Sequence, residues 1–298
     1  MRKITGTTAV TGIIGYPLTY TLSPLMHNRA FDVLDLNYRY LPFIVRVEEL
    51  APAIAGVKAL NIHGINVTMP HKETVIPFLD ELTEESRIMG AVNTILNSEG
   101  RLIGYNTDGD GFLKSLEEES FSPEDKSAII LGTGGAAKAV AIALARAGAH
   151  EIAIIGRSKA KAEAISEQIQ ANIKEIYVKT LTFSDNLADI FQHGELVVNA
   201  TPVGMNESGD LLPVPLEFIN ESQFVYDLIY VPLETPLLRL ARQKGARTAN
   251  GLGMLLHQAA IAFFVWTGIS APVEDMRQAL LEELESGDRP YNVSEKDR

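Results

Sequence analysis

Short apolar runs alternate with longer amphipathic stretches along the first hundred residues. This alternation predicts an α/β sheet, with strands over 8–15, 38–45 and 63–68 and helices over 24–34, 47–55, 71–78 and 83–90. Two further strands, 91–97 and 101–106, are separated by Ser-Glu-Gly, which is typical of a hairpin. A hairpin joins antiparallel strands, so the pattern predicts a mixed sheet rather than a wholly parallel one.

A second α/β pattern begins at Ser127. A continuous apolar strand runs into Gly132-Thr-Gly-Gly, an alanine-rich helix follows, and 151–157 form the next strand. Further strands at 175–182, 195–201 and 224–230, with a brief one before Asn250, bring the total to about six, as in a Rossmann-type domain. Two helical patterns, 251–267 and 271–286, have no strand after them.

The final helices are expected to return to the first domain, which gives a division that is discontinuous along the chain. We assign residues 1–107 together with 251–298 to one domain and residues 108–250 to the other. The polar residues from 287 onward are expected to form a frayed end. The predicted fold class is therefore α/β, a mixed-sheet domain joined to a Rossmann-type domain with a cleft between them.

Composition excludes several classes of function. A formal net charge of −12 without a basic stripe argues against nucleic acid and anionic membranes as partners. The chain has no cysteine and six scattered histidines, so we predict no metal site and no disulfide. The most apolar segment, 253–267, is too short to span a bilayer, and the N-terminus lacks the features of a signal peptide, which favours a cytoplasmic location.

The glycines at 132, 134 and 135 are the strongest local signal. They lie where a buried strand turns into an apolar helix, where backbone N–H groups can bind a pyrophosphate. The next strand ends at Gly156-Arg157-Ser158, where an NAD-selective site would offer an acidic residue to the ribose. Arg157, followed by Lys159 and Lys161, suits a 2′-phosphate, so NADP is favoured over NAD.

Candidate proton-transfer groups remain ambiguous from their local patterns. No tyrosine is followed by lysine four residues later, and zinc-dependent alcohol oxidation of the cysteine-ligated kind is excluded. Lys72 is either an exposed residue at a helix start or a proton-transfer group. Asp108 is either a proton-transfer group or a helix N-cap. Thr21 and Ser23 precede a helix with Pro24 at its first position; Ser23 suits an N-cap, and the two hydroxyls also suit a carboxylate ligand. Gln258 is almost the only residue with a side-chain amide on an otherwise apolar predicted helix.

Taken together, the motifs resemble the shikimate dehydrogenase family over nearly the whole chain, from about Val10 to Ala279. Eight blocks occur in the family's order and spacing: GYPxxxTLSPxxHN (15–28), NVTMPHK (66–72), AVNT (91–94), GYNTDG (104–109), GTGGA (132–136), NATPVGM (199–205), DLIYxPxxTPL (227–237) and GLGMLLxQA (251–259).

The resemblance implies reversible reduction of 3-dehydroshikimate to shikimate with NADPH, in chorismate and aromatic amino acid biosynthesis. The domain of 1–107 and 251–298 would bind substrate and that of 108–250 would bind NADP. The lysine–aspartate pair of the family matches Lys72 and Asp108. The implied substrate contacts are Thr21, Ser23, Asn66, Thr68, Asn93, Tyr230 and Gln258. The implied cofactor contacts are Gly132, Gly134, Gly135, Ala136, Arg157, Ser158, Thr201, Gly253 and Met254, with the 199–205 turn beside the nicotinamide.

Three positions depart from the family pattern. Thr21 replaces the commoner serine and adds a methyl group, which bears on the choice among shikimate, quinate and amino analogues. Gly156 replaces the usual asparagine before Arg157, which removes one contact to the cofactor phosphate. Asn250 stands where aspartate is frequent.

Two alternatives remain beside this interpretation. One is a quinate/shikimate dehydrogenase that uses NAD, which the missing acid after the second Rossmann strand disfavours. The other is a nucleotide-sensing regulator on the same fold, which has no need of both Lys72 and Asp108. The expected partner is a small molecule, and either a monomer or a homodimer is compatible with the sequence.

Overall fold

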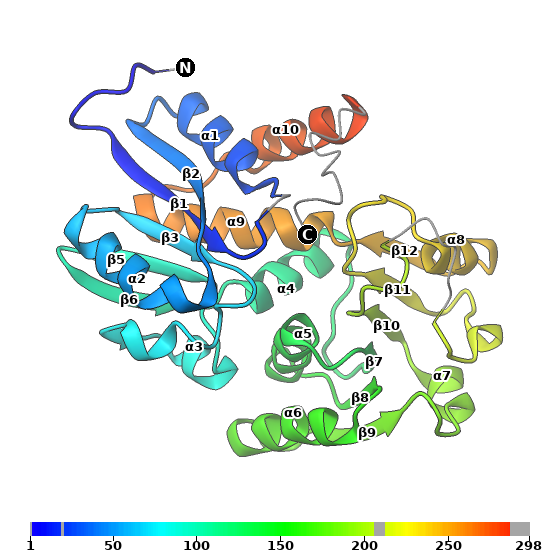
Figure 1. The fold of residues 1–298 in the computed structure, drawn as a ribbon. Helices are drawn as coiled ribbons and strands as arrows, with labels where there is room; N and C mark the ends of the chain where they lie inside the picture. The colour runs from blue at the N-terminus through cyan, green and yellow to red at the C-terminus, as the bar shows by residue number, and fades with distance from the viewer. Residues whose placement is uncertain (1, 19–20, 206–211, 287–298) are drawn as a thin grey trace, which may run out of the picture. The chain divides into compact units, whose positions relative to one another are not determined.

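The computed structural model describes residues 2–18, 21–205 and 212–286 (Figure 1). The chain divides into two compact units, residues 1–107 with 258–298 and residues 108–257. The predicted frayed end at 287–298 lies outside the described residues. None of the described helices is long and apolar enough to cross a membrane.

The first unit is built on a six-stranded mixed sheet of order β2-β1-β3-β5-β6-β4. Its strands are β1 (Ala9–Gly15), β2 (Tyr38–Ile44), β3 (Gly64–Val67), β4 (Glu81–Leu82), β5 (Thr94–Ser98) and β6 (Arg101–Tyr105). β5 pairs antiparallel with both β3 and β6, which confirms the predicted mixed sheet. The β5–β6 turn places Glu99 and Gly100 at φ 52° and 87°, the left-handed pair that a tight hairpin requires.

Helices cover both faces of this sheet. They are α1 (Ser23–Val33), α2 (Leu50–Ala59), α3 (Glu84–Met89), the end of α9 (Leu252–Thr267) and α10 (Val273–Ser286). α2 packs over a core that includes Ile14, Val57 and Ile65. α10 lies beside α1, where Arg29 and Glu282 form an ion pair at 2.7 Å, so the final helix packs on the first unit as expected (Figure 1).

Trp266 shows how closely α9 packs on the first unit. A Cβ at Gly64 would lie 2.1 Å from the indole Nε1, so only glycine at that position of β3 admits the ring. The indole Nε1 donates to the Ile95 carbonyl at 3.0 Å, and the His63 ring nitrogen bonds to the Trp266 carbonyl at 2.7 Å. The helix is thereby fixed to two neighbouring strands.

The prediction of a helix over 71–78 is wrong. The segment forms turns followed by the short 3-10 helix η2 (Ile76–Phe78). Ile76 N donates to the Glu73 carbonyl at 3.3 Å, the Lys72 carbonyl accepts from Val92 N at 2.7 Å instead, and Pro77 supplies no N–H. The predicted helix near 47–55 is the 3-10 turn η1 (Val47–Glu49) leading into α2, and the two-residue strand β4 was not predicted.

The second unit is a wholly parallel sheet of order β12-β11-β10-β7-β8-β9. Its strands are β7 (Ser127–Leu131), β8 (Glu151–Gly156), β9 (Tyr177–Thr182), β10 (Leu196–Asn199), β11 (Phe224–Asp227) and β12 (Arg247–Asn250). Numbered from β7, this is the order 3-2-1-4-5-6 of a Rossmann domain. The six predicted strands are confirmed, and so is the predicted α/β class with one mixed sheet and one Rossmann-type sheet.

Helices α4 (Asp108–Glu118), α5 (Gly135–Arg146), α6 (Lys159–Asn172), α7 (Ala188–His193) and α8 (Pro236–Gln243), with the 3-10 turn η3 (Leu216–Phe218), accompany this sheet. Residues 251–257, which the sequence analysis assigned to the first domain, lie in the second unit. Met254 N donates to the Tyr226 hydroxyl at 3.3 Å, and Gly253 lies against Ser115, so the first turns of α9 pack on residues of this unit.

Candidate functional site

Polar side chains of the first unit gather around the end of β3. Val67 N and the Asn66 amide both donate to the Asn93 carbonyl, at 2.8 and 3.1 Å. Because Val92 N also bonds to the Lys72 carbonyl, the segment from Asn66 to Lys72 is tied at both ends to the segment that contains Asn93. The sequence-predicted residues Asn66, Lys72 and Asn93 therefore belong to one neighbourhood.

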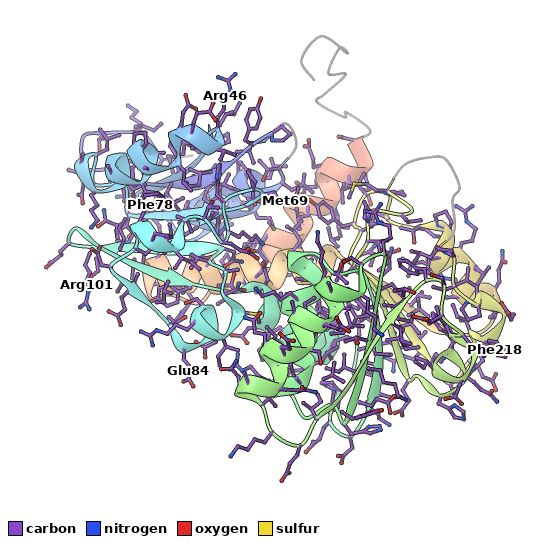
Figure 2. The ribbon with its side chains drawn as sticks, turned by 60° about the horizontal axis from the view of Figure 1, so that its bottom comes forward. Arg46, Met69, Phe78, Glu84, Arg101 and Phe218 are labelled. Carbon is purple, nitrogen blue, oxygen red and sulfur yellow. The ribbon has the colours of Figure 1, made fainter. Side chains whose placement is uncertain are left out.

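Thr68 and Met69 complete this segment. A Cβ at Gly15 would lie 2.4 Å from the Thr68 methyl, so β1 ends in glycine where the threonine approaches it. Tyr16 N donates to the Met69 carbonyl at 3.0 Å, while Met69, labelled in Figure 2, is 73% exposed. The backbone is fixed although the side chain at its tip is not buried.

Asn93 is the centre of a buried hydrogen-bond network. Its Oδ1 accepts from Thr107 N at 2.9 Å and from the Thr94 hydroxyl at 3.0 Å, and its Nδ2 donates to the Thr107 hydroxyl at 2.9 Å. Thr107 immediately precedes Asp108, which is nearly buried at the first position of α4. Sequence reasoning did not select Thr107, although the GYNTDG block contains it.

Ser23 is not the N-cap of α1, contrary to the prediction. The cap is Leu22, whose side chain makes no capping bond, and the Thr21 hydroxyl accepts from Ser23 N at 3.3 Å. Pro24 in the first turn lacks an N–H, which leaves Ser23 as the first helical residue. The Ser23 hydroxyl is thus not used to cap its own helix; it hydrogen-bonds to the Tyr40 hydroxyl instead, in the first turn of α1 at the positive end of the helix dipole.

The turn after β7 has the geometry of a nucleotide cradle. Gly132 has φ +123°, and a Cβ there would lie 2.8 Å from the Ala200 carbonyl, so glycine is required. A Cβ at Gly134 or Gly135 would meet nothing within 4 Å, and the N-terminus of α5 has no side-chain cap. Exposed N–H groups over open space are what a pyrophosphate needs.

The end of β8 presents positive charge. Arg157 is exposed, and none of the ion pairs among the described residues involves it. Ser158 caps α6 by accepting from Lys161 N at 3.5 Å, so its hydroxyl has a structural partner already. Gly156 is explained by its surroundings: a Cβ there would lie 2.5 Å from the Thr133 methyl, so the asparagine of the family pattern does not fit beside this threonine.

The loop after β10 is held by a buried carboxylate that sequence reasoning missed. Asn199 donates to Asp227 Oδ1 at 3.0 Å and accepts from Thr201 N and from the Thr201 hydroxyl at 3.0 and 2.7 Å. The Thr235 hydroxyl donates to Asp227 Oδ2 at 2.7 Å. Burial raises the pKa of Asp227, and these hydrogen bonds oppose the shift. The partners are far apart in sequence, so no local pattern reveals the group.

Asn250, the third departure from the family pattern, has both halves of its amide engaged. Its Nδ2 donates to the Leu233 carbonyl and its Oδ1 accepts from Leu252 N, each at 3.0 Å. An aspartate would keep the cap of α9 but lose the bond to Leu233. Tyr230 and Gln258 are both half-buried, Tyr230 in the second unit and Gln258 in the first.

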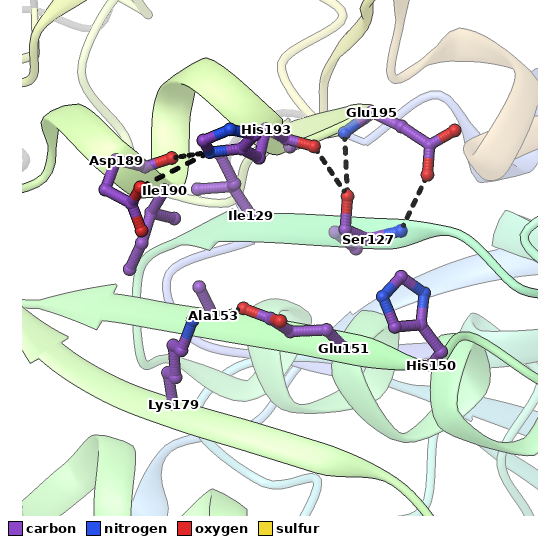
Figure 3. Close-up of a pocket in the computed structure, with 12 residues that line it drawn as sticks. Ser127, Ile129, His150, Glu151, Ala153, Lys179, Asp189, Ile190, His193 and Glu195 are labelled. Atoms are coloured by element: carbon purple, nitrogen blue, oxygen red, sulfur yellow. Dashed lines mark hydrogen bonds and ion pairs between the residues drawn. The ribbon is translucent and has the colours of Figure 1, made fainter.

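A hollow at the opposite, amino-terminal edge of the second sheet is also polar (Figure 3). Its acids are already paired, Glu195 with Lys126 and Glu151 with Lys179, each at 2.7 Å. Within the described part of the chain, no three His, Cys, Asp or Glu side chains are placed to hold a metal ion.

Comparison with known proteins assigns the family. Residues 13–95 match the shikimate dehydrogenase substrate binding domain, residues 251–281 match the shikimate 5′-dehydrogenase C-terminal domain, and residues 128–208 match the saccharopine dehydrogenase NADP binding domain. A shikimate dehydrogenase (NADP(+)) of Desulforamulus reducens is 46% identical over 96% of this chain and 99% of its own length. The chain belongs to the shikimate dehydrogenase family.

Two further members of the shikimate dehydrogenase family show how widely the likeness extends. The Carboxydothermus hydrogenoformans enzyme, also a shikimate dehydrogenase (NADP(+)), is 48% identical over 93% of this chain and 98% of its own. A crystal structure of the Listeria monocytogenes shikimate 5-dehydrogenase, in complex with shikimate and NAD, superimposes with a TM-score of 0.90 at 37% identity. It covers 94% of this chain and 99% of the other. Both units of the fold are thus shared.

Proposed function

We propose that this protein is an NADP-dependent shikimate dehydrogenase, which reversibly reduces 3-dehydroshikimate to shikimate. The observation that carries the proposal is the buried polar network around Asn66 and Asn93, in a chain whose relatives bear this name along almost their whole length. A ring that bears several hydroxyls requires many fixed donors and acceptors, and this network supplies them.

The first unit supplies the proposed substrate contacts. Asn66, Thr68, Asn93 and Gln258 would bind ring hydroxyls, with Tyr230 of the second unit as a further contact. Thr21 and Ser23 would bind the carboxylate, because two hydroxyls at a helix N-terminus favour an anion. The methyl group of Thr21 leaves less room for the carboxylate than a serine would.

The glycine turn and Arg157 would hold NADP, which supplies or accepts hydride when bound. The backbone N–H groups at Gly134, Gly135 and Ala136 would bind the pyrophosphate, and Arg157 with Ser158 would bind the 2′-phosphate. Thr201, Gly253 and Met254 would line the nicotinamide end. The absence of an acidic residue at the end of β8 supports NADP over NAD.

Lys72 would donate a proton to the ketone oxygen in the reducing direction and accept it from the hydroxyl in the oxidising direction. Asp108 would accept a hydrogen bond from a neighbouring ring hydroxyl and orient Lys72. A positioned acid–base group of this kind contributes about 10² to 10⁴ in rate.

The deciding experiment follows the absorbance of reduced nicotinamide with shikimate or quinate, each against NADP and NAD. We expect the shikimate–NADP pair to give the highest kcat/KM. A preference for quinate with NAD would favour the second dehydrogenase interpretation. Nucleotide binding without turnover of either acid would favour a regulator.

A further inference from the structure

Tyr40 is one of the largest fully buried side chains of the first unit, and α1 holds both of its ends. The Asn28 side chain pairs with its backbone: Nδ2 donates to the Tyr40 carbonyl at 3.0 Å, and Oδ1 accepts from Tyr40 N at 2.9 Å. The His27 ring stacks on the phenol ring with centroids 4.4 Å apart and planes 12° apart. The His-Asn pair at the end of the TLSPLMHN block therefore places one tyrosine.

The Tyr40 hydroxyl reaches across β1 to β3. Thr11 of β1 pairs with Tyr40 on one side and with Gly64 on the other, so Tyr40 and Asn66 point to the same face of the sheet. The hydroxyl donates to Asn66 Oδ1 at 2.7 Å. Burial raises the pKa of Tyr40 well above its ordinary value, against the opposing effect of a hydrogen bond with the Ser23 side chain, so the phenol keeps the proton that it donates.

These contacts fix the orientation of the Asn66 side-chain amide. Its Nδ2 donates to the Asn93 carbonyl at 3.1 Å and to the Thr94 hydroxyl at 3.0 Å, which uses both of its N–H bonds. A flipped amide would set Oδ1 against the Asn93 carbonyl, two acceptors face to face. With one lone pair taken by Tyr40, the carbonyl oxygen has one left, so the side chain can offer a ligand only an acceptor.

We propose that Tyr40 is a positioning residue that fixes Asn66 as an acceptor for a substrate hydroxyl that is not oxidised in the reaction. The inference rests on the proposed function, in which Asn66 contacts a ring hydroxyl. The oxygen that reacts is a carbonyl in the oxidised substrate and has no proton to donate. Facing Asn66 it would be opposed by another acceptor, so Asn66 must bind a hydroxyl that stays a hydroxyl in both redox states.

A double-mutant cycle tests whether Tyr40 acts through Asn66. Tyr40→Phe removes only the hydroxyl, and we expect the KM for shikimate to rise about 5- to 10-fold, the worth of one hydrogen bond, with kcat within about 3-fold. The KM for NADP should not change. Because the Ser23 hydroxyl also hydrogen-bonds to Tyr40, the cycle is run in a Ser23→Ala background. With Asn66 also changed to alanine there, Tyr40→Phe should have almost no further effect on the KM for shikimate, because the groups that it contacts are gone.

Tyr38→Phe is the matched control. Tyr38 lies on the same face of β2, and its hydroxyl contacts a His63 ring nitrogen at 3.4 Å rather than Asn66. It should leave all kinetic constants unchanged. Equal effects of Tyr40→Phe with and without Asn66 would overturn the inference, as would a parallel rise in the KM for NADP. Failure of the wild-type protein to oxidise shikimate would instead defeat the proposed function itself.

A substrate series provides a test that does not depend on the folding of Tyr40→Phe. Shikimate analogues in which one ring hydroxyl at a time is replaced by fluorine, which cannot donate, are compared on wild type and Asn66→Ala. We expect one non-reacting position at which fluorine raises the KM about 10-fold on wild type but not on Asn66→Ala. The analogue with fluorine at the reacting position cannot be oxidised, so it is compared through its inhibition constant. An Asn66-dependent effect at that position, or at no position, contradicts the inference.

Discussion

Lys72 lies in a turn rather than a helix, with its carbonyl bound to Val92 N. Lys72→Ala leaves that backbone bond in place and removes the proposed proton carrier. We expect kcat to fall by about 10² to 10⁴ with a smaller change in the KM for shikimate. Steady-state kinetics check this, with Lys114→Ala, on the exposed face of α4, as control. A large rise in KM at nearly unchanged kcat would make Lys72 a binding residue.

Arg157 is exposed at the end of β8 and has no ion-pair partner among the described residues. Arg157→Ala should raise the KM for NADP about 10-fold or more, since a charge-assisted contact is worth about 1.5–3 kcal/mol, and leave that for NAD nearly unchanged. Kinetics with both cofactors measure this, and Lys174→Ala, exposed beyond α6, is the control. Equal changes for NADP and NAD would refute the assignment.

His27 is completely buried among aromatic rings, and burial lowers its pKa to about 3. The unfolded chain binds a proton here below pH 6.5 and the folded chain does not, so the free energy of unfolding falls as pH drops from 6.5 toward 3. His27→Leu should remove this dependence. Relative to wild type, the variant should gain about 2 kcal/mol between pH 7.5 and pH 5.

Urea unfolding at a series of pH values checks the His27 prediction. His150→Gln, which changes an exposed histidine, should follow the wild-type dependence. If the difference between His27→Leu and wild type is the same at pH 5 and pH 7.5, the histidine is protonated in the folded protein and the argument fails.

Residues whose partners are close in sequence could be predicted, and those with distant partners could not. The glycine turn, Arg157 and the Asn66–Lys72 block are visible as local patterns. Tyr40 and Asp227 gain their roles from Asn66 and Asn199, which are 26 and 28 positions away. Ser23 was misplaced as an N-cap because hydroxyl preference at caps is statistical, whereas Thr21 makes the local bond here.

At the scale of elements, β8 and the turn after β7 are fitted to each other. Gly156→Ala should lower the free energy of unfolding by about 1–3 kcal/mol, because the new Cβ would lie 2.5 Å from the Thr133 methyl. Thr133→Ser removes that methyl and should recover most of the loss in the double variant. Urea unfolding measures the cycle.

Gly56→Ala is the matched control for Gly156→Ala, since a Cβ at this position of α2 meets nothing within 4 Å. It should leave stability unchanged or raise it slightly. Strict additivity of Gly156→Ala and Thr133→Ser would show that the two residues do not compete for the same space.

The elements that were predicted correctly are those with a long periodic signal. The buried strands of the second sheet and the hairpin of the first are examples. The segment 71–78 has helical spacing of apolar residues. However, the Lys72 carbonyl accepts a hydrogen bond from Val92 N, and Pro77 has no N–H to donate. A tertiary hydrogen bond overrode a local pattern there. β4 has two residues, too few for any periodicity.

At the scale of the molecule, the two units should respond to different ligands. If the proposed assignments are correct, shikimate alone should slow amide exchange around β3 and the start of α1. NADP alone should slow it in the turn after β7 and the 199–205 loop. Hydrogen exchange read by mass spectrometry tests this, with the amino-terminal edge of the second sheet as internal control. Protection of the glycine turn by shikimate alone would contradict the division of roles.

The packing of Trp266 against Gly64 has a consequence for synthesis of the protein on the ribosome. The second unit is continuous along the chain, so all of its residues have emerged once residue 257 has left the exit tunnel. The first unit cannot complete its packing at that point, because Trp266, which covers β3 and donates to the Ile95 carbonyl, is translated later. Until then the sheet face that carries Tyr40 and Gly64 lacks the cover of α9, and incompletely covered surface of this kind is a site for aggregation or chaperone binding. The part of the protein made first is therefore completed last.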